Sequence, residues 1–233
     1  VVVELDDRAE GGHRRLPVPS RVASVIRPRA GGGALVATER GIALGREEDL
    51  SDLKEVVSLT DDPTIRTNEG GCDPDGRFWV GTMSYDKVVG AAGVYRWDGP
   101  GTAPVLAWSG ATTANGLGFS PDGELGYWVD TPTRTVTVLD YDARAGLADP
   151  RPFVDIDEGA GKPDGLCVDA EGGVWVALHR GSAVRRYDAD GRLSEVVELP
   201  VSKVTACTFG GEGLDLLFIT TSRENLPDDV EPA

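Results

Sequence analysis

The chain has 233 residues, of which 40% are hydrophobic, and its 31 glycines and 15 prolines are typical of a turn-rich globular protein rather than a disordered one. One large all-β domain of this length is ordinary, so we expect a single domain over residues 1–233. The formal net charge of −16 argues against nucleic-acid and anionic-membrane partners, because both need basic surfaces. Small molecules or cations are the expected partners.

The three cysteines, Cys72, Cys167 and Cys207, are odd in number and form no C-x-x-C pair, so we expect reduced thiols. Cys167 and Cys207 lie in apolar stretches, which favours buried structural thiols over reactive ones. No segment approaches the roughly 18 apolar residues of a membrane helix, and no signal peptide is visible at the start. We therefore expect a cytoplasmic protein, as a monomer or weak homodimer.

A Gly-marked turn leads into a short apolar run five times along the chain. In chain order these segments are GGGALVAT ending at Thr38, DPDGRFWVGTM from Asp73, SPDGELGYWVDT from Ser120, DAEGGVWVALH from Asp169 and GGEGLDLLFITT from Gly210. Their anchor glycines, Gly33, Gly76, Gly123, Gly172 and Gly213, are 43, 47, 49 and 41 residues apart. This period is typical of four-stranded propeller blades. Helix formers occur at 46–57, but we interpret that segment as outer strands of a blade plus a loop.

The blade count predicts a six-bladed β-propeller, and we expect part of the first blade and the C-terminal end to be absent from the sequence. Neither the 32 residues before Gly33 nor the 20 after Gly213 hold a whole blade of about 45 residues. The join between Glu10 and Gly11 is the expected position of the missing segment, since AEGGHRR has no strand pattern.

A fixed offset within the repeat selects three candidate site residues. Five positions before the residue that opens each hairpin lie Asn68, Asn115 and Asp164, while the last repeat has Thr205 there and the first has Ser24 or Val25. Because equivalent positions of successive blades surround the propeller axis, we expect these three side chains to converge at one mouth of the channel. The alternative is that Asn115-Gly and Asp164-Gly are ordinary turn dipeptides.

Two amide oxygens and one carboxylate suit a hard divalent cation such as Ca²⁺ or Mg²⁺. A second carboxylate is expected in the incomplete first blade to balance the charge of the cation. Glu10 is the nearest candidate, but its position beside the expected gap does not support naming it as a ligand.

Four stretches of the chain resemble the SMP-30/gluconolactonase/regucalcin-like family. They are RTNEGGCDPDGRFWVGTM at 66–83, ANGLGFSPDG at 114–123, KPDGLCVDAEGGVWVA at 162–177 and TACTFGGEGLDLLFITTS at 205–222. The resemblance implies a six-bladed propeller that binds one divalent cation on its axis, with Ca²⁺ as the first choice and Zn²⁺, Mg²⁺ or Mn²⁺ as alternatives, and that hydrolyses sugar lactones. A third family ligand, a glutamate in a G-E-G-P motif, has no counterpart in this sequence and would follow Glu10.

The resemblance also implies a role for each matched residue. Asn115 and Asp164 match metal ligands of the family, Asp164 also matches its proposed general base, and Arg66 and Asn68 match a substrate-binding pair. The expected activity is opening of a sugar lactone, with the cation polarising the carbonyl and Asp164 helping to deprotonate water.

Other functions remain open at this stage. One is a non-enzymatic calcium-binding regulator or interaction scaffold, since one fold hosts many functions. Another is a related metal-dependent esterase. The sequence predicts no Ser/His/Asp catalytic triad, and we expect neither His13 nor His179 to be catalytic.

Overall fold

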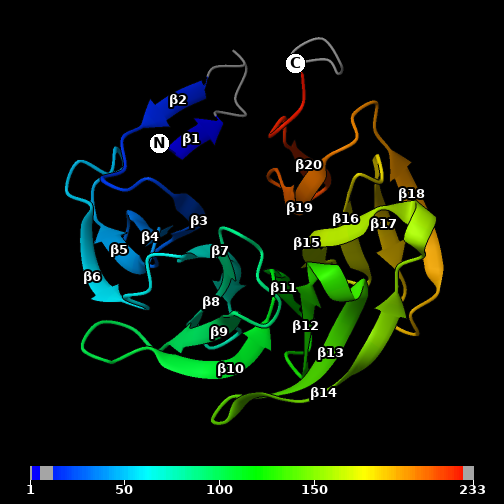
Figure 1. Cartoon of the computed structure of the whole chain (residues 1–233), viewed down its shortest axis with the longest axis horizontal. Coiled ribbons are helices and arrows are strands. Elements are labelled where there is room, and N and C mark those ends of the chain that lie inside the picture. Colours follow the sequence, from blue (N-terminus) through cyan, green and yellow to red (C-terminus); the bar gives the residue numbers. More distant parts are fainter. Residues whose placement is uncertain (1, 6–12, 228–233) are drawn as a thin grey trace. The chain divides into compact units, whose positions relative to one another are not determined.

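The structure, a computed structural model, describes residues 2–5 and 13–227, and these residues form strands joined by short turns (Figure 1). Two single-turn 3₁₀-helices, η1 (Thr131–Thr133) and η2 (Glu158–Ala160), interrupt the strands, and the described residues contain no α-helix. A search of the same residues finds no helix long and apolar enough to cross a membrane. The expected join at Glu10 and Gly11 and the side chain of His13 lie outside what the structure describes.

The strands form antiparallel sheets in chain order, four of them with four strands each and two with two strands among the described residues. The first pair is β1 (Val2–Leu5) and β2 (His13–Leu16). The first four-stranded sheet contains β3 (Ala23–Pro28), β4 (Ala34–Thr38), β5 (Gly41–Gly45) and β6 (Lys54–Ser58). The second contains β7 (Ile65–Cys72), β8 (Phe78–Ser84), β9 (Ala92–Trp97) and β10 (Val105–Ala111).

The remaining sheets repeat this plan. The third contains β11 (Ala114–Phe119), β12 (Leu125–Asp130), β13 (Thr135–Asp142) and β14 (Gly146–Asp155). The fourth contains β15 (Lys162–Val168), β16 (Val174–His179), β17 (Ala183–Tyr187) and β18 (Leu193–Glu198), and the final pair is β19 (Val204–Gly210) and β20 (Leu216–Thr221). Four-stranded antiparallel sheets in sequence are the blade units of a propeller.

The chain divides into two compact units, 1–113 and 114–233. In the first unit, Val25, Ile42, Phe78 and Val80 join one apolar cluster between the first and second four-stranded sheets. In the second unit, Val129, Val136, Val174 and Val176 belong to a cluster between the third and fourth sheets. A further cluster, which includes Trp175 and Cys207, packs the fourth sheet on β19 and β20.

Burial falls from the second strand of a sheet to its last strand. All seven residues of β8 are buried, whereas β10 and β18 are mostly exposed. A strand covered on both faces needs a continuous apolar sequence rather than alternation, which explains why the runs after each anchor glycine are so apolar.

The structure confirms the turns and moves two of the anchors by one residue. Gly76, Gly123 and Gly172 adopt left-handed φ angles of 79°, 72° and 83°, and each N–H bonds to the carbonyl three residues earlier. In the first repeat the N–H that closes the turn belongs to Gly32, not Gly33, and in the last it belongs to Leu214, not Gly213. Leu214 takes the left-handed conformation at φ 53°, so the glycine pattern misplaced this turn.

The interpretation of 46–57 as strand and loop is confirmed, because β6 begins at Lys54 and the preceding residues form turns. The described cysteines are free thiols, with Cys207 buried and Cys72 exposed. The sulfur atoms of Cys167 and Cys207 lie 3.7 Å apart, well beyond the roughly 2.05 Å of a disulfide bond.

Candidate functional site

The first strand of each sheet from β3 onward carries an irregularity at the same place. The pairing register shifts between Thr67 and Gly70 in β7, between Ala114 and Leu117 in β11, and between Pro163 and Leu166 in β15. Shorter shifts leave out Ser24 in β3 and Thr205 in β19. Such β-bulges redirect a side chain away from the regular alternation and are frequent beside active sites.

These bulges contain the residues that the repeat offset selected. Asn68, Asn115 and Asp164 each lie inside the shifted segment of their own strand. The Asn-Gly and Asp-Gly dipeptides are therefore parts of strands, and the turn interpretation of them is wrong.

The glycines after Asn115 and Asp164 allow the first strands of neighbouring sheets to approach closely. A Cβ atom on Gly116 would lie 2.8 Å from the carbonyl oxygen of Asp164 and 2.6 Å from the amide nitrogen of Leu166. A Cβ on Gly165 would lie 2.8 Å from the carbonyl oxygen of Thr205. A side chain at either glycine would push apart the strands that carry the site.

A hydrogen-bonded chain connects Asn115 to the residue before Asp164. The amide Nδ2 of Asn115 donates to Thr131 Oγ1 at 2.6 Å, and Thr131 Oγ1 donates to the carbonyl oxygen of Pro163 at 2.8 Å. Asn115 is 7% exposed and Asp164 is half-buried. Thr131, in η1, thus fixes the plane of the Asn115 amide, with Oδ1 on the side away from the threonine.

In the first unit the predicted substrate-binding pair is in direct contact. Nη1 of Arg66 donates to Asn68 Oδ1 at 3.1 Å and to the carbonyl oxygen of Thr67 at 2.8 Å. The guanidinium carbon of Arg66 also lies 6.0 Å from the centre of the Tyr85 ring, within cation–π range. Five N–H donors in a fixed plane are suited to a polyhydroxylated ligand.

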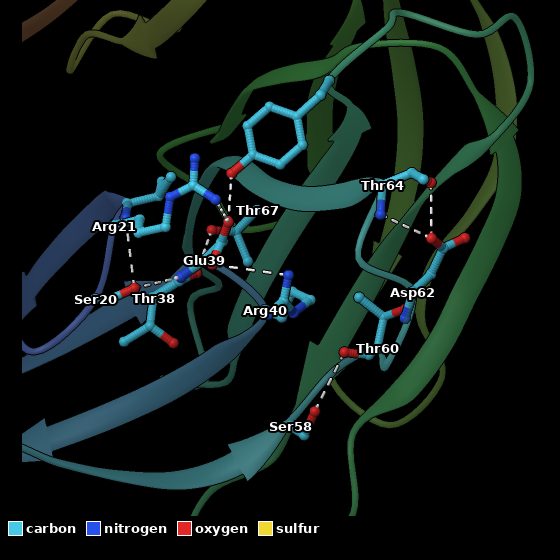
Figure 2. A network of polar contacts seen from close by, with 12 residues as sticks. Ser20, Arg21, Thr38, Glu39, Arg40, Ser58, Thr60, Asp62, Thr64 and Thr67 are labelled. Atoms are coloured by element: carbon cyan, nitrogen blue, oxygen red, sulfur yellow. Dashed lines mark hydrogen bonds and ion pairs between the residues drawn. The ribbon is translucent and has the colours of Figure 1, made fainter.

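A polar cleft of about 490 Å³ is lined by residues of the first four-stranded sheet and of the loops before and after it. Its lining includes Ser20, Arg21, Glu39, Arg40 and Glu55. Figure 2 shows Glu39 near the centre of a network that includes Ser20, Arg21 and Arg40.

The structure brings Asn115 near Asp164 in the second unit and Arg66 against Asn68 in the first. Convergence of Asn68, Asn115 and Asp164 at one channel mouth stays a prediction. Sequence reasoning missed Thr131, Glu39 and Tyr85. No pattern in the sequence indicates the partner of Thr131, Glu39 or Tyr85.

The donor atoms of Asn115 and Asp164 fit a hard divalent cation, because the buried amide is held in one orientation and the carboxylate follows on the adjacent strand. Within residues 2–5 and 13–227, no group of three or more His, Cys, Asp or Glu side chains could hold a metal ion. The candidate metal ligands among these residues therefore include amide oxygens beside the Asp164 carboxylate. The expected glutamate after Glu10 lies outside the described residues.

Consecutive four-stranded antiparallel sheets place the protein in the β-propeller class. Bulges at matched positions present polar residues on the first strands of these sheets. The profile of the family described as SMP-30/Gluconolactonase/LRE-like region matches residues 3–223. The chain belongs to this family.

Relatives and solved structures agree with this assignment. The chain is 37% identical over 214 residues to pentonolactonase XacC of Haloferax volcanii, covering 91% of this chain and 72% of the relative. It is 34% identical to regucalcin of Danio rerio, covering 87% of this chain and 69% of the relative. A crystal structure of the calcium-binding protein regucalcin from Agrobacterium tumefaciens superposes with a TM-score of 0.87 at 32% identity, over 94% of this chain and 74% of that one. The predicted all-β propeller class is confirmed.

Proposed function

We propose that this protein is a divalent-cation-dependent hydrolase that opens sugar lactones. The observation that supports this most directly is the series of matched bulges, which presents Asn68, Asn115 and Asp164 from equivalent positions of three sheets. The 37% identity to a pentonolactonase supports the lactone as substrate class.

In the proposed mechanism Asn115 and Asp164 hold the cation, with Ca²⁺ as first choice and Zn²⁺, Mg²⁺ or Mn²⁺ as alternatives. When bound, the cation supplies Lewis-acid polarisation of the lactone carbonyl. Thr131 keeps the Asn115 amide oxygen in one orientation through its bond to Nδ2. An oriented ligand loses less entropy when the cation binds.

The Asp164 carboxylate acts as the general base. It accepts a proton from the water that attacks the carbonyl carbon, and the proton then passes to the ring oxygen that leaves as an alcohol. The lactone and one water molecule give a single product, a hydroxy acid, and no further reactant is required. Arg66 and Asn68 hold the sugar hydroxyls, with Arg66 donating and Asn68 able to donate or accept.

The direct test is acid release from gluconolactone and from a pentonolactone, followed with a pH indicator after chelation and after each cation is restored. The expected result is hydrolysis that depends on added cation and stays near the spontaneous rate without it. Hydrolysis that survives exhaustive chelation contradicts the Lewis-acid role. Hydrolysis of simple apolar esters but not lactones favours the esterase alternative.

A second candidate function is calcium binding without turnover. It is favoured by the similarity to regucalcins and to a regucalcin structure described as a calcium-binding protein. Both candidates bind Ca²⁺, so the lactone assay separates them. A regulator that binds Ca²⁺ in calorimetric titration leaves lactone hydrolysis at the uncatalysed rate, whereas the proposed enzyme raises it.

A further inference from the structure

Glu39 connects the first sheet to the strand that carries Arg66 and Asn68. Directly after β4, its N–H donates to Ser20 Oγ at 3.0 Å, and its carbonyl oxygen accepts the N–H of Thr67 at 2.8 Å. Thr67 is the residue between Arg66 and Asn68. The Glu39 side chain is only 13% exposed and lies 3.9 Å from Arg21 and 3.7 Å from Arg40 (Figure 2).

The carboxylate of Glu39 holds Tyr85 in place. Tyr85 follows β8, its hydroxyl donates to Glu39 Oε1 at 2.5 Å, and its N–H donates to the carbonyl oxygen of Thr64 at 2.9 Å. This hydroxyl contact lowers the pKa of Glu39 and raises the pKa of Tyr85. The hydrogen bond therefore pairs an ionised carboxylate with a protonated phenol, a charge-assisted arrangement.

The Tyr85 ring in turn contacts Arg66. The guanidinium lies 6.0 Å from the ring centre while its Nη1 bonds to Asn68. The contacts thus run without interruption from Glu39 through Tyr85 and Arg66 to Asn68.

We propose that Tyr85, fixed by Glu39, is a positioning residue that holds Arg66 in its substrate-binding orientation. The inference rests on the proposed function, in which Arg66 and Asn68 hold sugar hydroxyls. Neither Tyr85 nor Glu39 takes a proton from the substrate or the attacking water. Their effect passes through Arg66.

An arginine side chain has many rotamers, and ordering it at the moment of binding weakens affinity. A cation–π contact such as that between Arg66 and Tyr85 stabilises one orientation of the guanidinium. Loss of the Tyr85–Arg66 contact weakens substrate binding in the ground state and in the transition state alike. We therefore expect KM to rise more than kcat falls.

A purely structural role for the same residues is distinguishable. The backbone N–H and carbonyl of Glu39 already join the loop before β3 to β7, and side-chain substitutions leave those bonds in place. Tyr85 is 40% exposed, so its replacement removes little core packing. Side-chain variants therefore test the positioning role separately from the fold.

The experiment measures kcat and KM for Tyr85→Leu, Tyr85→Phe, Glu39→Ala and Glu39→Gln, each alone and combined with Arg66→Ala. Tyr85→Leu is expected to raise KM about tenfold, with kcat changed less than about twofold. Tyr85→Phe keeps the ring and Glu39→Gln keeps an acceptor, so both are expected to lie between wild type and the more severe variant at the same position. In the Arg66→Ala background all four effects should vanish, because residues that act through one another are not additive.

Two matched controls accompany these variants. Tyr95→Phe removes a hydroxyl from β9 of the same sheet, and Glu198→Gln neutralises an exposed carboxylate at the end of β18. Neither contacts Arg66 in the interactions described above, and both should leave KM at the wild-type value. An equal loss from Tyr85→Leu with and without Arg66 overturns the proposal.

A second readout needs no turnover. In an NMR spectrum of the arginine Nε–Hε groups, the Arg66 signal, assigned by its loss in Arg66→Ala, should be displaced by the Tyr85 ring current. Tyr85→Phe should keep the displacement and Tyr85→Leu should remove it. If wild type opens no lactone, the proposed function fails while this measurement still decides the Tyr85–Arg66 contact. A signal that does not move in Tyr85→Leu overturns it.

Discussion

The carboxylate of Asp169 accepts a hydrogen bond from the indole Nε1 of Trp175 at 2.8 Å, and the second sheet repeats this contact between Asp73 and Trp79 at 2.9 Å. Each aspartate opens a hairpin and also accepts the backbone N–H groups two and four residues later. A single carboxylate thus fixes both the turn and the tryptophan of the following strand. The Asp-x-x-Gly pattern therefore stabilises the fold at these two turns.

Replacing Asp73 by alanine should strongly destabilise the first unit. The Asp73 carboxylate is fully buried and accepts bonds from Arg77 Nε at 2.7 Å and from Trp79, so its loss leaves donors without their acceptor. Breaking a buried charged network of this kind costs about 3–5 kcal/mol. Urea denaturation measures the free energy of unfolding.

Asp75→Ala is the control for this change, because Asp75 is on the same turn but its side chain is 47% exposed. It should change the free energy of unfolding by less than about 0.5 kcal/mol. Equal losses from the two variants contradict a special role for Asp73.

The contribution of Asp169 to stability should disappear in acid. Burial raises the pKa of its carboxyl, but hydrogen bonds from Arg186, Trp175 and two backbone N–H groups outweigh this, so the pKa is lowered overall. A group whose pKa is lowered by folding stabilises the protein above its unfolded pKa of about 3.9, and the contribution is lost as the pH falls through the folded value.

The measurement compares the free energy of unfolding of wild type and Asp169→Asn as the pH is lowered. The difference in the free energy of unfolding between the two proteins should be largest near neutrality and should decrease below about pH 4. Asp190→Asn, at an exposed ion pair with Arg192, serves as control and should show no such narrowing. If this difference stays constant as the pH falls below about 4, folding does not lower the pKa of Asp169.

The repeat located the bulge residues because a bulge lies at a nearly fixed distance before each turn, which is a local property of the chain. Asn68, Asn115 and Asp164 could therefore be selected from spacing. The contact between Glu39 and Tyr85 spans 46 positions and two sheets, and no periodicity relates those residues. Thr131 was likewise hidden, since its role depends on how β11 and β15 pack.

Asp164→Asn should abolish lactone hydrolysis while leaving the fold intact. The amide cannot accept a proton from water at neutral pH, and general-base catalysis contributes about a hundredfold or more. Turnover of gluconolactone is the assay, with circular dichroism to verify folding. Asp155→Asn, on the exposed β14, is the control and should turn over normally. Normal turnover by Asp164→Asn excludes the general-base assignment.

Thr131→Val should weaken cation binding without touching a ligand. The change removes the hydroxyl that joins Asn115 Nδ2 to the Pro163 carbonyl, so the amide loses this restraint on its orientation. Loss of such an outer partner reduces metal affinity about 10- to 100-fold. Calorimetric titration with Ca²⁺ is the measurement. Thr133→Val, whose hydroxyl bonds to the Asp130 carbonyl in the same turn, should bind as wild type does.

Leu214→Asn should stabilise the protein. Leu214 is 67% exposed and adopts φ 53° at the turn position that glycine occupies in the four other repeats. A left-handed conformation costs an ordinary residue about 1–2 kcal/mol, and asparagine tolerates it better without the added backbone freedom of glycine. We expect a gain of about 0.5–1 kcal/mol in the free energy of unfolding. The control is Leu216→Asn, an exposed leucine in regular strand conformation, where asparagine should give no gain because strands disfavour it. If both variants lose stability equally, the left-handed turn at Leu214 is not the strained position that its φ angle indicates.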